Sequence, residues 1–226
     1  MNIDLRPSST GCAGFSAGCA EALPPEWRES LHSYSEGNVA VIRAHISGVD
    51  VILETDSRLF SPRKVDAGTL AMLSCVQFSE NDKVLDLGCG YGVVGIVVAK
   101  LIGPDRVWMI DSDALAIEVA RKNALLNGVE DLRIVESNGF NDLREAGFTQ
   151  ILCNPPYHMD FQIPKQFIHK GFNRLLVGGK LWMVTQRQAW YRNKLRAIFG
   201  AVREHSRPPY TVFEAAKASP TYARST

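Results

Sequence analysis

Val84-Leu85-Asp86-Leu87-Gly88-Cys89-Gly90-Tyr91-Gly92 leads from a short apolar run into a turn with glycine at every second position. The apolar run predicts a buried strand, and the apolar residues that continue to Leu101 predict a helix. A glycine-rich turn between a strand and a helix is typical of α/β proteins that bind a ligand at the helix N-terminus. We therefore expect an α/β fold whose ligand sits at this turn.

Two motifs overlap in the turn. Gly90, Gly92 and Gly95 match the G-x-G-x-x-G fingerprint of dinucleotide-binding proteins, with Asp111 placed where a ribose-binding acid stands. The stretch also fits a second pattern, in which the strand-ending Asp86 precedes alternate glycines. The carboxylate of Asp86 would repel a pyrophosphate at the helix N-terminus, whereas it suits the positively charged groups of S-adenosylmethionine. The charge of Asp86 thus favours S-adenosylmethionine as the cofactor.

Strand and helix patterns alternate along the rest of the chain. Strands are predicted at 83–87, 106–110, 132–135, 148–153, 180–185, near 202 and at 211–215, and helices from 66 to about 76, at 92–101, after Asp113, at 164–176 and at 191–199. This order predicts an open, mostly parallel Rossmann-like sheet with helices on both faces. Residues 39–46 and 49–53 alternate around Ser47-Gly48, which predicts a β-hairpin ahead of the sheet. Residues 1–37 are expected to form an arm, partly disordered or with a short helix, and residues 38–226 one folded domain.

The helix after Asp113 has an apolar face in the sequence. Its members are Leu115, Val119, Leu125 and Leu126, and Asn127-Gly128 is a typical helix end. We expect this face to pack against the sheet.

Polar residues follow four successive predicted strands. They are Asp86, Asp111, Asn138 and Asn154. Ligands of open sheets bind outside the carboxyl ends of the strands, so these side chains are expected at one rim. Asp111 is placed to accept hydrogen bonds from ribose hydroxyls and Asn138 to bind the adenine amino edge, although a helix cap and a turn residue are the alternative roles. The predicted cofactor-binding residues are Asp86, Gly88, Cys89, Gly90, Asp111, Ser112, Asn138, Gly139, Phe140 and Asn154.

The tetrapeptide Asn154-Pro155-Pro156-Tyr157 follows the fourth strand. The side-chain carbonyl of Asn154 and the main-chain carbonyl of Pro155 are two acceptors that can grip a planar NH₂ group, and Tyr157 offers a stacking face to the ring that bears it. Asn154, Pro155 and Tyr157 are therefore the predicted catalytic residues. A rigid turn is the alternative reading. His158 is placed either to take up the released proton or as a surface group.

Charge is unevenly distributed along the 226 residues, although the net charge is only +1. Residues 1–158 hold 13 Lys and Arg against 21 Asp and Glu, and residues 159–226 hold 12 against 3. Such an asymmetry predicts a polyanionic partner, here RNA bound by the basic C-terminal half. The basic residues include Lys165, Lys170, Arg174, Arg187, Arg192, Lys194, Arg196, Arg203 and Arg207, of which any one can also simply solvate a helix face.

Several function classes are disfavoured by composition. The five cysteines are an odd number without a C-x-x-C pair, so neither a disulfide framework nor a metal site is expected. The longest apolar run is far shorter than the roughly 20 residues of a transmembrane helix. Residues 1–22 lack the continuous apolar stretch of a signal peptide. We expect a cytoplasmic protein that binds no metal and no membrane.

With these motifs the chain resembles the class I S-adenosylmethionine-dependent methyltransferases, in the small-domain group that includes ribosomal RNA guanine exocyclic-amine methyltransferases. The resemblance covers roughly residues 38–217 and rests on Thr55 to Ser61, Val65-Asp66, the glycine-rich turn, Ser137-Asn138, Asn154 to His158, and Tyr210 to Ala215. It implies an enzyme that methylates an exocyclic amino group of a nucleobase, with guanine in ribosomal RNA as the expected target.

Other functions stay open at this point. Tyr157 is common among adenine-amine and protein glutamine-amide methylases, which use the same grip on an NH₂ group. A nicotinamide-dependent oxidoreductase would need the glycines to cradle a pyrophosphate. A non-catalytic RNA-binding module is the remaining alternative, and the presence of Asp86, Asp111 and Asn154 argues against it.

Overall fold

A computed structural model of the protein describes residues 38–155 and 161–223. The predicted N-terminal arm, Tyr157 and His158 lie outside the described residues. The chain begins with the predicted hairpin, β1 (Val39–Ile46) and β2 (Val49–Asp56). The elements that follow are α3 (Ala67–Leu73), β3 (Val84–Leu87), α4 (Val93–Ile102), the 3-10 turn η1 (Pro104–Arg106), β4 (Val107–Asp111), α5 (Ala114–Leu126), β5 (Arg133–Glu136), β6 (Phe148–Cys153), α6 (Gln162–Arg174), β7 (Leu175–Thr185), α7 (Gln188–Phe199), β8 (Val202–Arg207) and β9 (Tyr210–Ala216).

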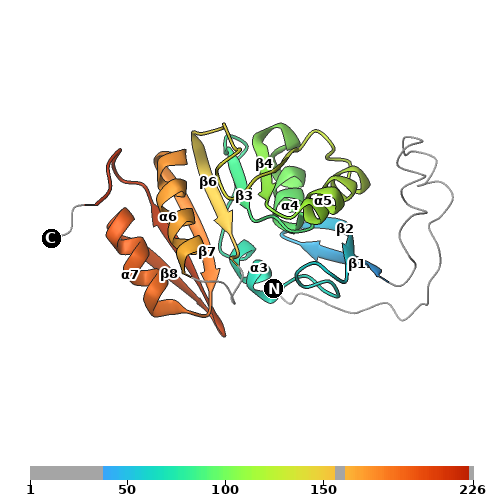
Figure 1. The fold of residues 1–226 in the computed structure, drawn as a ribbon, viewed down its shortest axis with the longest axis horizontal. Coiled ribbons are helices and arrows are strands. Elements are labelled where there is room, and N and C mark those ends of the chain that lie inside the picture. The colour runs from blue at the N-terminus through green and yellow to red at the C-terminus, as the bar shows by residue number, and fades with distance from the viewer. Residues whose placement is uncertain (1–37, 156–160, 224–226) are drawn as a thin grey trace.

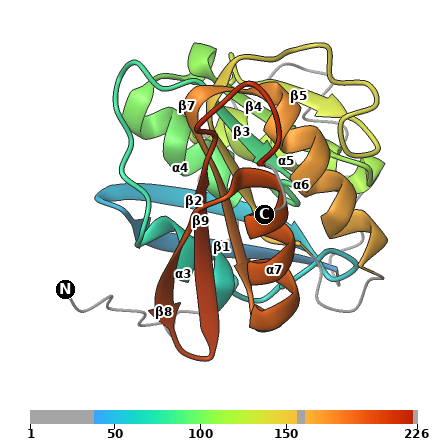
Figure 2. The same ribbon diagram turned by 90° about the vertical axis from the view of Figure 1, so that its left-hand side faces the viewer.

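Seven strands form the central sheet in the order β5-β4-β3-β6-β7-β9-β8. The neighbours from β5 to β7 are parallel, and β9 runs antiparallel to both β7 and β8. The predicted open, mostly parallel Rossmann-like sheet is therefore confirmed. The hairpin lies beside α4 and α5, and α6 and α7 lie at the other end of the molecule (Figure 1). Figure 2 shows β8 and β9 at the sheet edge with α7 alongside.

Successive residues of the strands face two separate hydrophobic cores. Val107 and Met109 of β4 belong to the core shared with α3, α4, α5 and the hairpin, whereas Trp108 and Ile110 belong to the core shared with α6 and α7. This alternation is the period of two that a strand covered on both faces requires. It leaves the carboxyl ends of the strands as the place where polar side chains can meet.

Two glycines of the turn have definite structural roles. Gly92 is the N-cap of α4 and has a φ of 96°, a conformation that residues with a Cβ rarely adopt. A Cβ at Gly95 would lie 2.4 Å from Cγ and Sδ of Met109. Gly95 therefore allows α4 to pack closely on β4, which brings the helix N-terminus to the end of β3.

Two asparagines, one within α5 and one at its C-cap, hold the hairpin in place. Oδ1 of Asn123 accepts from the backbone N–H of Glu54 at 2.7 Å, and its Nδ2 donates to the carbonyls of Glu54 and Tyr91, each at 2.8 Å. One turn later, Asn127 makes the same pair of bonds with Ile52, at 3.0 and 2.7 Å. The two amides thus replace a neighbouring strand along the open edge of β2.

The prediction of the apolar face of α5 is partly wrong, because Asn123 faces the hairpin. Val119 is 4% exposed as expected, but Leu125 and Leu126 are only half-buried, while Asn123 is completely buried. The helix is rotated so that the asparagine amide, rather than the leucines, meets the hairpin, because buried backbone groups of β2 need partners.

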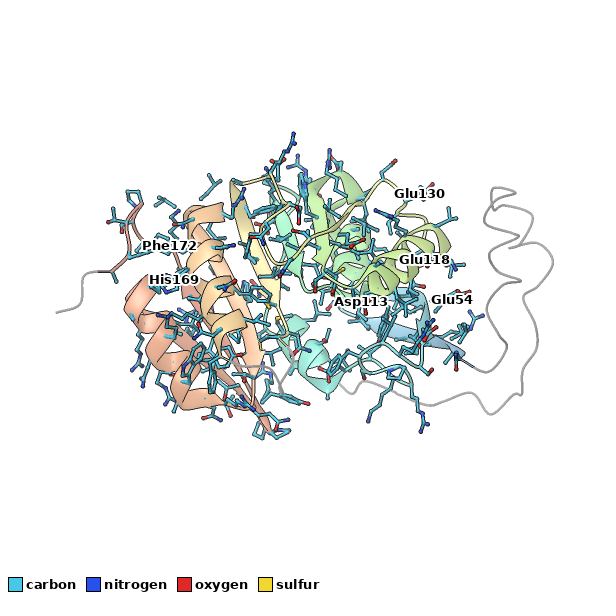
Figure 3. The ribbon with its side chains drawn as sticks, in the orientation of Figure 1. Glu54, Asp113, Glu118, Glu130, His169 and Phe172 are labelled. Carbon is cyan, nitrogen blue, oxygen red and sulfur yellow. The ribbon has the colours of Figure 1, made fainter. Side chains whose placement is uncertain are left out.

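An electrostatic interaction also links the hairpin to α5. Burial raises the pKa of Glu54 in β2, and the charge of Lys122 opposes this shift. Nζ of Lys122 lies 3.3 Å from Oε1 of Glu118, so a buried lysine is placed between two acids. In Figure 3, Glu54 and Glu118 lie at the hairpin end of the molecule, and His169 and Phe172 lie on α6.

We expect Asn123→Ala to lower the free energy of unfolding by about 2–4 kcal/mol, because it leaves three backbone polar groups without a partner, two of them on buried Glu54. Asn127→Ala should cost about 1 kcal/mol, since Asn127 is half-buried and water can replace its amide. Urea denaturation measures both values. Equal losses for the two variants would contradict this account of the hairpin.

The boundary between α6 and β7 differs from the prediction. The helix ends at Arg174 and the strand begins at Leu175, where a longer helix and a strand starting at 180 were expected. The apolar run Leu175-Leu176-Val177 continues the helical pattern in the sequence. In the structure Leu175 pairs with Phe148 of β6 and is 3% exposed, whereas Leu176 and Val177 are 51% and 59% exposed. Sheet pairing overrides the helical pattern here.

Candidate active site

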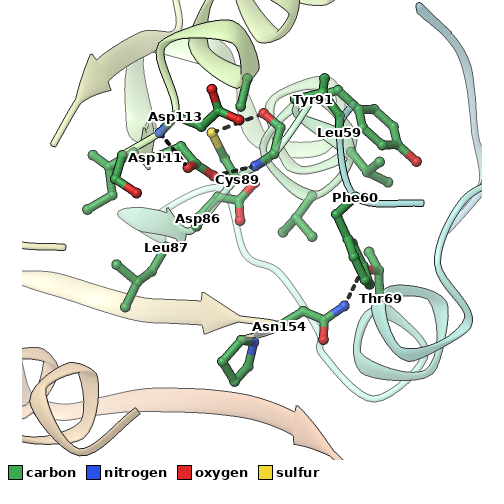
Figure 4. A pocket seen from close by; sticks show the side chains of 18 of the residues that line it. Leu59, Phe60, Thr69, Asp86, Leu87, Cys89, Tyr91, Asp111, Asp113 and Asn154 are labelled. Carbon is green, nitrogen blue, oxygen red and sulfur yellow. Dashed lines mark hydrogen bonds between the residues drawn. The ribbon is translucent and has the colours of Figure 1, made fainter. Parts of the chain in front are cut away.

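A cavity of about 390 Å³ opens at the carboxyl ends of the parallel strands (Figure 4). It is bounded by the glycine-rich turn, the end of β4, the segment after β5, the exit of β6, α3 and the start of α6. The predicted residues that line it are Asp86, Gly88, Cys89, Gly90, Asp111, Ser112, Asn138, Gly139, Asn154 and Pro155. The fold therefore brings the residues from four separate strand ends to one space.

Asp86 lies at the floor of this cavity and is 3% exposed. Its Oδ2 accepts a hydrogen bond from the backbone N–H of Gly95 at 2.9 Å. Burial raises the pKa of Asp86 to about 7; the hydrogen bond from Gly95 lowers it, and the charge of Asp111 raises it further. A carboxylate in this position gains most from a cationic ligand, because a positive charge offsets the cost of its burial.

We expect Asp86→Asn to raise the free energy of unfolding of the cofactor-free protein by about 1–4 kcal/mol at pH 8. Asn can still accept from Gly95 but carries no charge. Unfolded Asp ionises near pH 4, below the folded pKa of about 7, so the folded wild type binds more protons between these values and loses stability as the pH rises through them. Denaturation at pH 4 and pH 8 measures the difference, and a difference that shrinks toward pH 8 would contradict the prediction.

Asp111 holds the glycine-rich turn together with the end of β4. Its Oδ2 accepts from the N–H of Gly90 at 2.9 Å, and its Oδ1 accepts from the N–H of Asp113 at 3.0 Å. The cap of α5 is Asp113, whose side chain accepts from the N–H of Leu115. The alternative role of Asp111 as a helix cap is therefore taken by Asp113, and the half-buried Asp111 faces the cavity.

The segment after β5 forms another wall. The buried Ser137 donates from its N–H to the carbonyl of Asp111 at 2.7 Å and from its Oγ to the carbonyl of Gly139 at 2.9 Å. These bonds place Asn138 and Gly139 against the cavity. Phe140, in contrast, is 3% exposed in the core beneath and packs edge to face on Phe167, which lines the cavity. Contrary to the prediction, Phe140 thus does not line the cavity but packs beneath it against Phe167.

Asn154 extends from the end of β6 toward α3. Its Nδ2 donates to Oδ2 of Asp66 at 2.8 Å and to Oγ1 of Thr69 at 2.9 Å. Pro155 is buried and lines the same wall. The two acceptors of the predicted amine grip therefore stand at the cavity, while Tyr157, the predicted stacking residue, lies outside the described residues.

The structure adds residues that were not among the predicted site residues. Asp66, Thr69, Phe60 and Phe167 line the cavity, and Phe60 is 54% exposed at its mouth, near Asn154 in Figure 4. The hydroxyl of Tyr91 donates to carbonyls in the loop that carries Phe60. Asp is a common helix N-cap residue, so the role of Asp66 at the start of α3 is a local one, whereas its contact with Asn154, 88 residues away, cannot be read from the sequence.

The family model of the methyltransferase small domain matches residues 50–214. The chain belongs to this family. The prediction that the protein is a methyltransferase, with the resemblance on which it rested, is thereby confirmed. The matched range includes most of the hairpin strand β2, the segments that form the cavity, and the sheet as far as most of β9.

Curated relatives of this methyltransferase include proteins that are named as ribosomal RNA methyltransferases. The chain is 30% identical over 166 residues to YbxB of Bacillus subtilis, covering 70% of this chain and 83% of that protein. It is 32% identical over 167 residues to ribosomal RNA large subunit methyltransferase G of Alteromonas mediterranea, covering 69% and 41%. It is 33% identical over 156 residues to ribosomal RNA small subunit methyltransferase C of Serratia proteamaculans, covering 67% and 44%. The match thus spans less than half of the two RNA methyltransferases.

A solved structure agrees with the fold of the methyltransferase. The 16S ribosomal RNA N2 methyltransferase RsmC of T. thermophilus, in complex with S-adenosylmethionine and guanosine, superposes with a TM-score of 0.72 at 26% identity, covering 80% of this chain and 51% of that one. The cofactor predicted from the sequence is the one that this relative holds.

Three of the five cysteines of the methyltransferase lie within the described residues. Cys75, Cys89 and Cys153 are free thiols. Burial, with the charges of Asp86 and Asp111, raises the pKa of Cys89 and Cys153 well above the usual value, so both stay protonated. Among residues 38–155 and 161–223, no cluster of His, Cys, Asp and Glu is arranged to hold a metal ion. Within the same residues, no helix is both long and apolar enough to cross a bilayer.

Part of the basic surplus of the methyltransferase is used within the molecule. Arg192 binds both carboxylate oxygens of Glu204, each at 2.7 Å, and Arg203 lies 3.5 Å from Glu214. Arg187 is exposed and lies over the ring of Phe161, which stacks on Trp190 with 4.5 Å between ring centroids. Several basic side chains of α7, β8 and the segment before α7 are thus engaged in contacts within the molecule.

Proposed function

We propose that the protein is an S-adenosylmethionine-dependent methyltransferase that modifies the exocyclic amino group of a nucleobase, with guanine in ribosomal RNA as its substrate. The single observation that carries the proposal is that Asn154 and Pro155 line the same cavity as Asp86 and Asp111. The acceptors suited to an NH₂ group and the acids suited to a cationic nucleoside thus line the same cavity.

The cavity fits the cofactor in charge. Asp86 is a buried carboxyl that accepts a hydrogen bond from the N–H of Gly95, and a cation nearby would stabilise its charged form. Asp111 has two carboxylate oxygens, each with capacity for a second hydrogen bond, which suits the two hydroxyls of a ribose. We infer that Asp86, Asp111, Asn138 and the backbone of Gly88 to Gly90 hold S-adenosylmethionine.

The residues of the chain contribute mainly by positioning. When bound, the cofactor supplies an electrophilic methyl group, which the substrate nitrogen takes up as it releases one proton. Hydrogen bonds from the substrate NH₂ to the side-chain carbonyl of Asn154 and the main-chain carbonyl of Pro155 would hold the nitrogen with its lone pair free to react. Orientation of this kind can account for a large share of the rate. Stacking of the base on Tyr157 stays a prediction.

RNA is the favoured substrate for two reasons. Two of the curated relatives are named as ribosomal RNA methyltransferases, and the solved relative binds guanosine. The C-terminal half of this chain carries the basic surplus that phosphate attraction requires. The role of this surface, the division of the chain at residue 37 and a cytoplasmic location remain predictions.

The test is nucleoside mass spectrometry. Ribosomal RNA from cells without the gene is incubated with purified protein and isotopically labelled S-adenosylmethionine, then digested. We expect labelled N2-methylguanosine, which is absent when RNA from wild-type cells is used because its site is already modified. Label in adenosine instead would favour an adenine-amine methyltransferase. No label in RNA would overturn the proposal.

The same grip also fits the amide of a protein glutamine, which makes that reaction the second candidate. Incubation with a translation factor in place of RNA separates the two, since only one substrate should take up label. The family match argues against the nicotinamide-dependent oxidoreductase, and the presence of Asp86, Asp111 and Asn154 in the cavity argues against a non-catalytic RNA-binding module.

A further inference from the structure

Helix α3 contacts the substrate side of the cavity through Asn154. Nδ2 of Asn154 donates two hydrogen bonds to the start of this helix, to Oδ2 of its N-cap Asp66 at 2.8 Å and to Oγ1 of Thr69 at 2.9 Å. An amide NH₂ group has two hydrogens, so the two bonds use both of them. The NH₂ group of Asn154 therefore points at α3.

The chemistry of Asp66 determines which way round the amide lies. An asparagine side chain can be turned by 180° with almost no change of shape, and the turn exchanges its donor end for its acceptor end. A carboxylate can only accept hydrogen bonds. The nitrogen must therefore face Asp66, and the carbonyl oxygen Oδ1 must face away from α3.

The two acceptors are themselves held firmly. Oδ2 of Asp66 also accepts from the backbone N–H of Thr69 at 2.9 Å, which caps the N-terminus of α3. Thr69 is 8% exposed, and Met72 and Leu73 on the next turn are buried in the core. Asp66 and Thr69 therefore form a rigid clamp on the amide of Asn154.

We propose that Asp66 and Thr69 are positioning residues that fix Asn154 as a hydrogen-bond acceptor, and so restrict the reaction to a target nitrogen that carries hydrogens. The inference rests on the proposed function, and deepens it by naming what selects an amine. If Asn154 turned over, its NH₂ group would meet the NH₂ group of the substrate and repel it. A ring nitrogen without hydrogen, which needs a donor, is excluded by the clamp.

Variants of the clamp can be matched closely. Asp66→Ser keeps a side chain that caps helices but is too short to reach Asn154. Thr69→Val keeps the shape of Thr69 and removes its oxygen. Asp66→Asn keeps an oxygen in the position of Oδ2 and serves as the conservative variant. Ser74→Ala, on an exposed residue at the end of the same helix, is the control.

The first measurement is kinetic. We expect Asp66→Ser and Thr69→Val each to lower kcat on RNA by about tenfold to hundredfold, since small errors of orientation have effects of this size. The Kd for S-adenosylmethionine by calorimetry and the Tm should stay near the wild-type values. Asp66→Asn should keep most of the wild-type activity, because its side-chain oxygen can still accept from Asn154. If Asp66 acted only through its negative charge, this variant would be as impaired as Asp66→Ser. Wild-type kcat in both Asp66→Ser and Thr69→Val would overturn the inference.

The second measurement does not depend on activity. The side-chain NH₂ signals of Asn154 are identified in nitrogen-15 NMR spectra by their loss in Asn154→Ala. In the cofactor-free protein we expect their hydrogens to exchange slowly with solvent, and to exchange fast in the double variant with Asp66→Ser and Thr69→Val. Fast exchange in the wild type would overturn the clamp. Slow exchange in a wild type that methylates no RNA would instead sink the proposed function and leave the orientation standing.

Discussion

Asn154→Ala is expected to lower kcat for methyl transfer by at least about a thousandfold while the Kd for S-adenosylmethionine stays near its wild-type value. The variant removes one of the two carbonyls that orient the substrate amine. It also removes the NH₂ group that donates to Asp66 and Thr69. The acidic residues of the cavity are untouched. Single-turnover kinetics and calorimetry on the same preparation measure the two quantities.

A matched control is Asn141→Ala, which removes an exposed asparagine that accepts a hydrogen bond from Lys170 outside the cavity. It should behave as the wild type in both measurements. Asn154→Asp should be as inactive as Asn154→Ala, because its carboxylate would face that of Asp66. Turnover retained in Asn154→Ala would remove this residue from the reaction.

Asp111→Ala is expected to show the reverse pattern, with the Kd for S-adenosylmethionine raised by about a hundredfold or more. Two charge-assisted hydrogen bonds to ribose hydroxyls would be lost, each contributing about 1.5–3 kcal/mol. The glycine-rich turn would also loosen, because Gly90 and Asp113 donate to the two oxygens of Asp111. Calorimetric titration measures the change.

Asp131→Ala serves as the control for loss of one exposed acid beyond α5. Its Kd should match that of the wild type. Saturating cofactor should restore much of the turnover of Asp111→Ala, whereas it cannot restore Asn154→Ala. An unchanged Kd in Asp111→Ala would place the ribose elsewhere in the cavity.

Much of the fold could be predicted because its signals are local. β6 begins at Phe148 and ends at Cys153, as the sequence predicts, since a segment that ends in the apolar residues 151–153 is bounded by Gly147 and by Asn154-Pro155. The caps of α5 at Asp113 and Asn127 were likewise readable from neighbouring residues. Where a local pattern was ambiguous, at Leu175 to Val177, pairing with another strand settled the structure against the helical prediction.

The candidate site was predictable to the extent that it depends on strand ends. Asp86, Asp111, Asn138 and Asn154 each lie within two residues of a strand end, and parallel strands bring such positions together whatever the details of packing. Phe140 differs because its neighbour Gly139 turns the chain, so that the phenylalanine enters the core rather than the cavity.

The order of strands and helices, the acidic glycine-rich turn and the tetrapeptide at Asn154 are all properties of residues close together in the chain. They could therefore be predicted from the amino-acid sequence alone. The clamp of Asp66 and Thr69 on Asn154, and the support of β2 by Asn123 and Asn127, join residues 69 to 88 positions apart. Such contacts exist only once the helices have packed, because the partner of a polar side chain is whichever buried group packing leaves beside it.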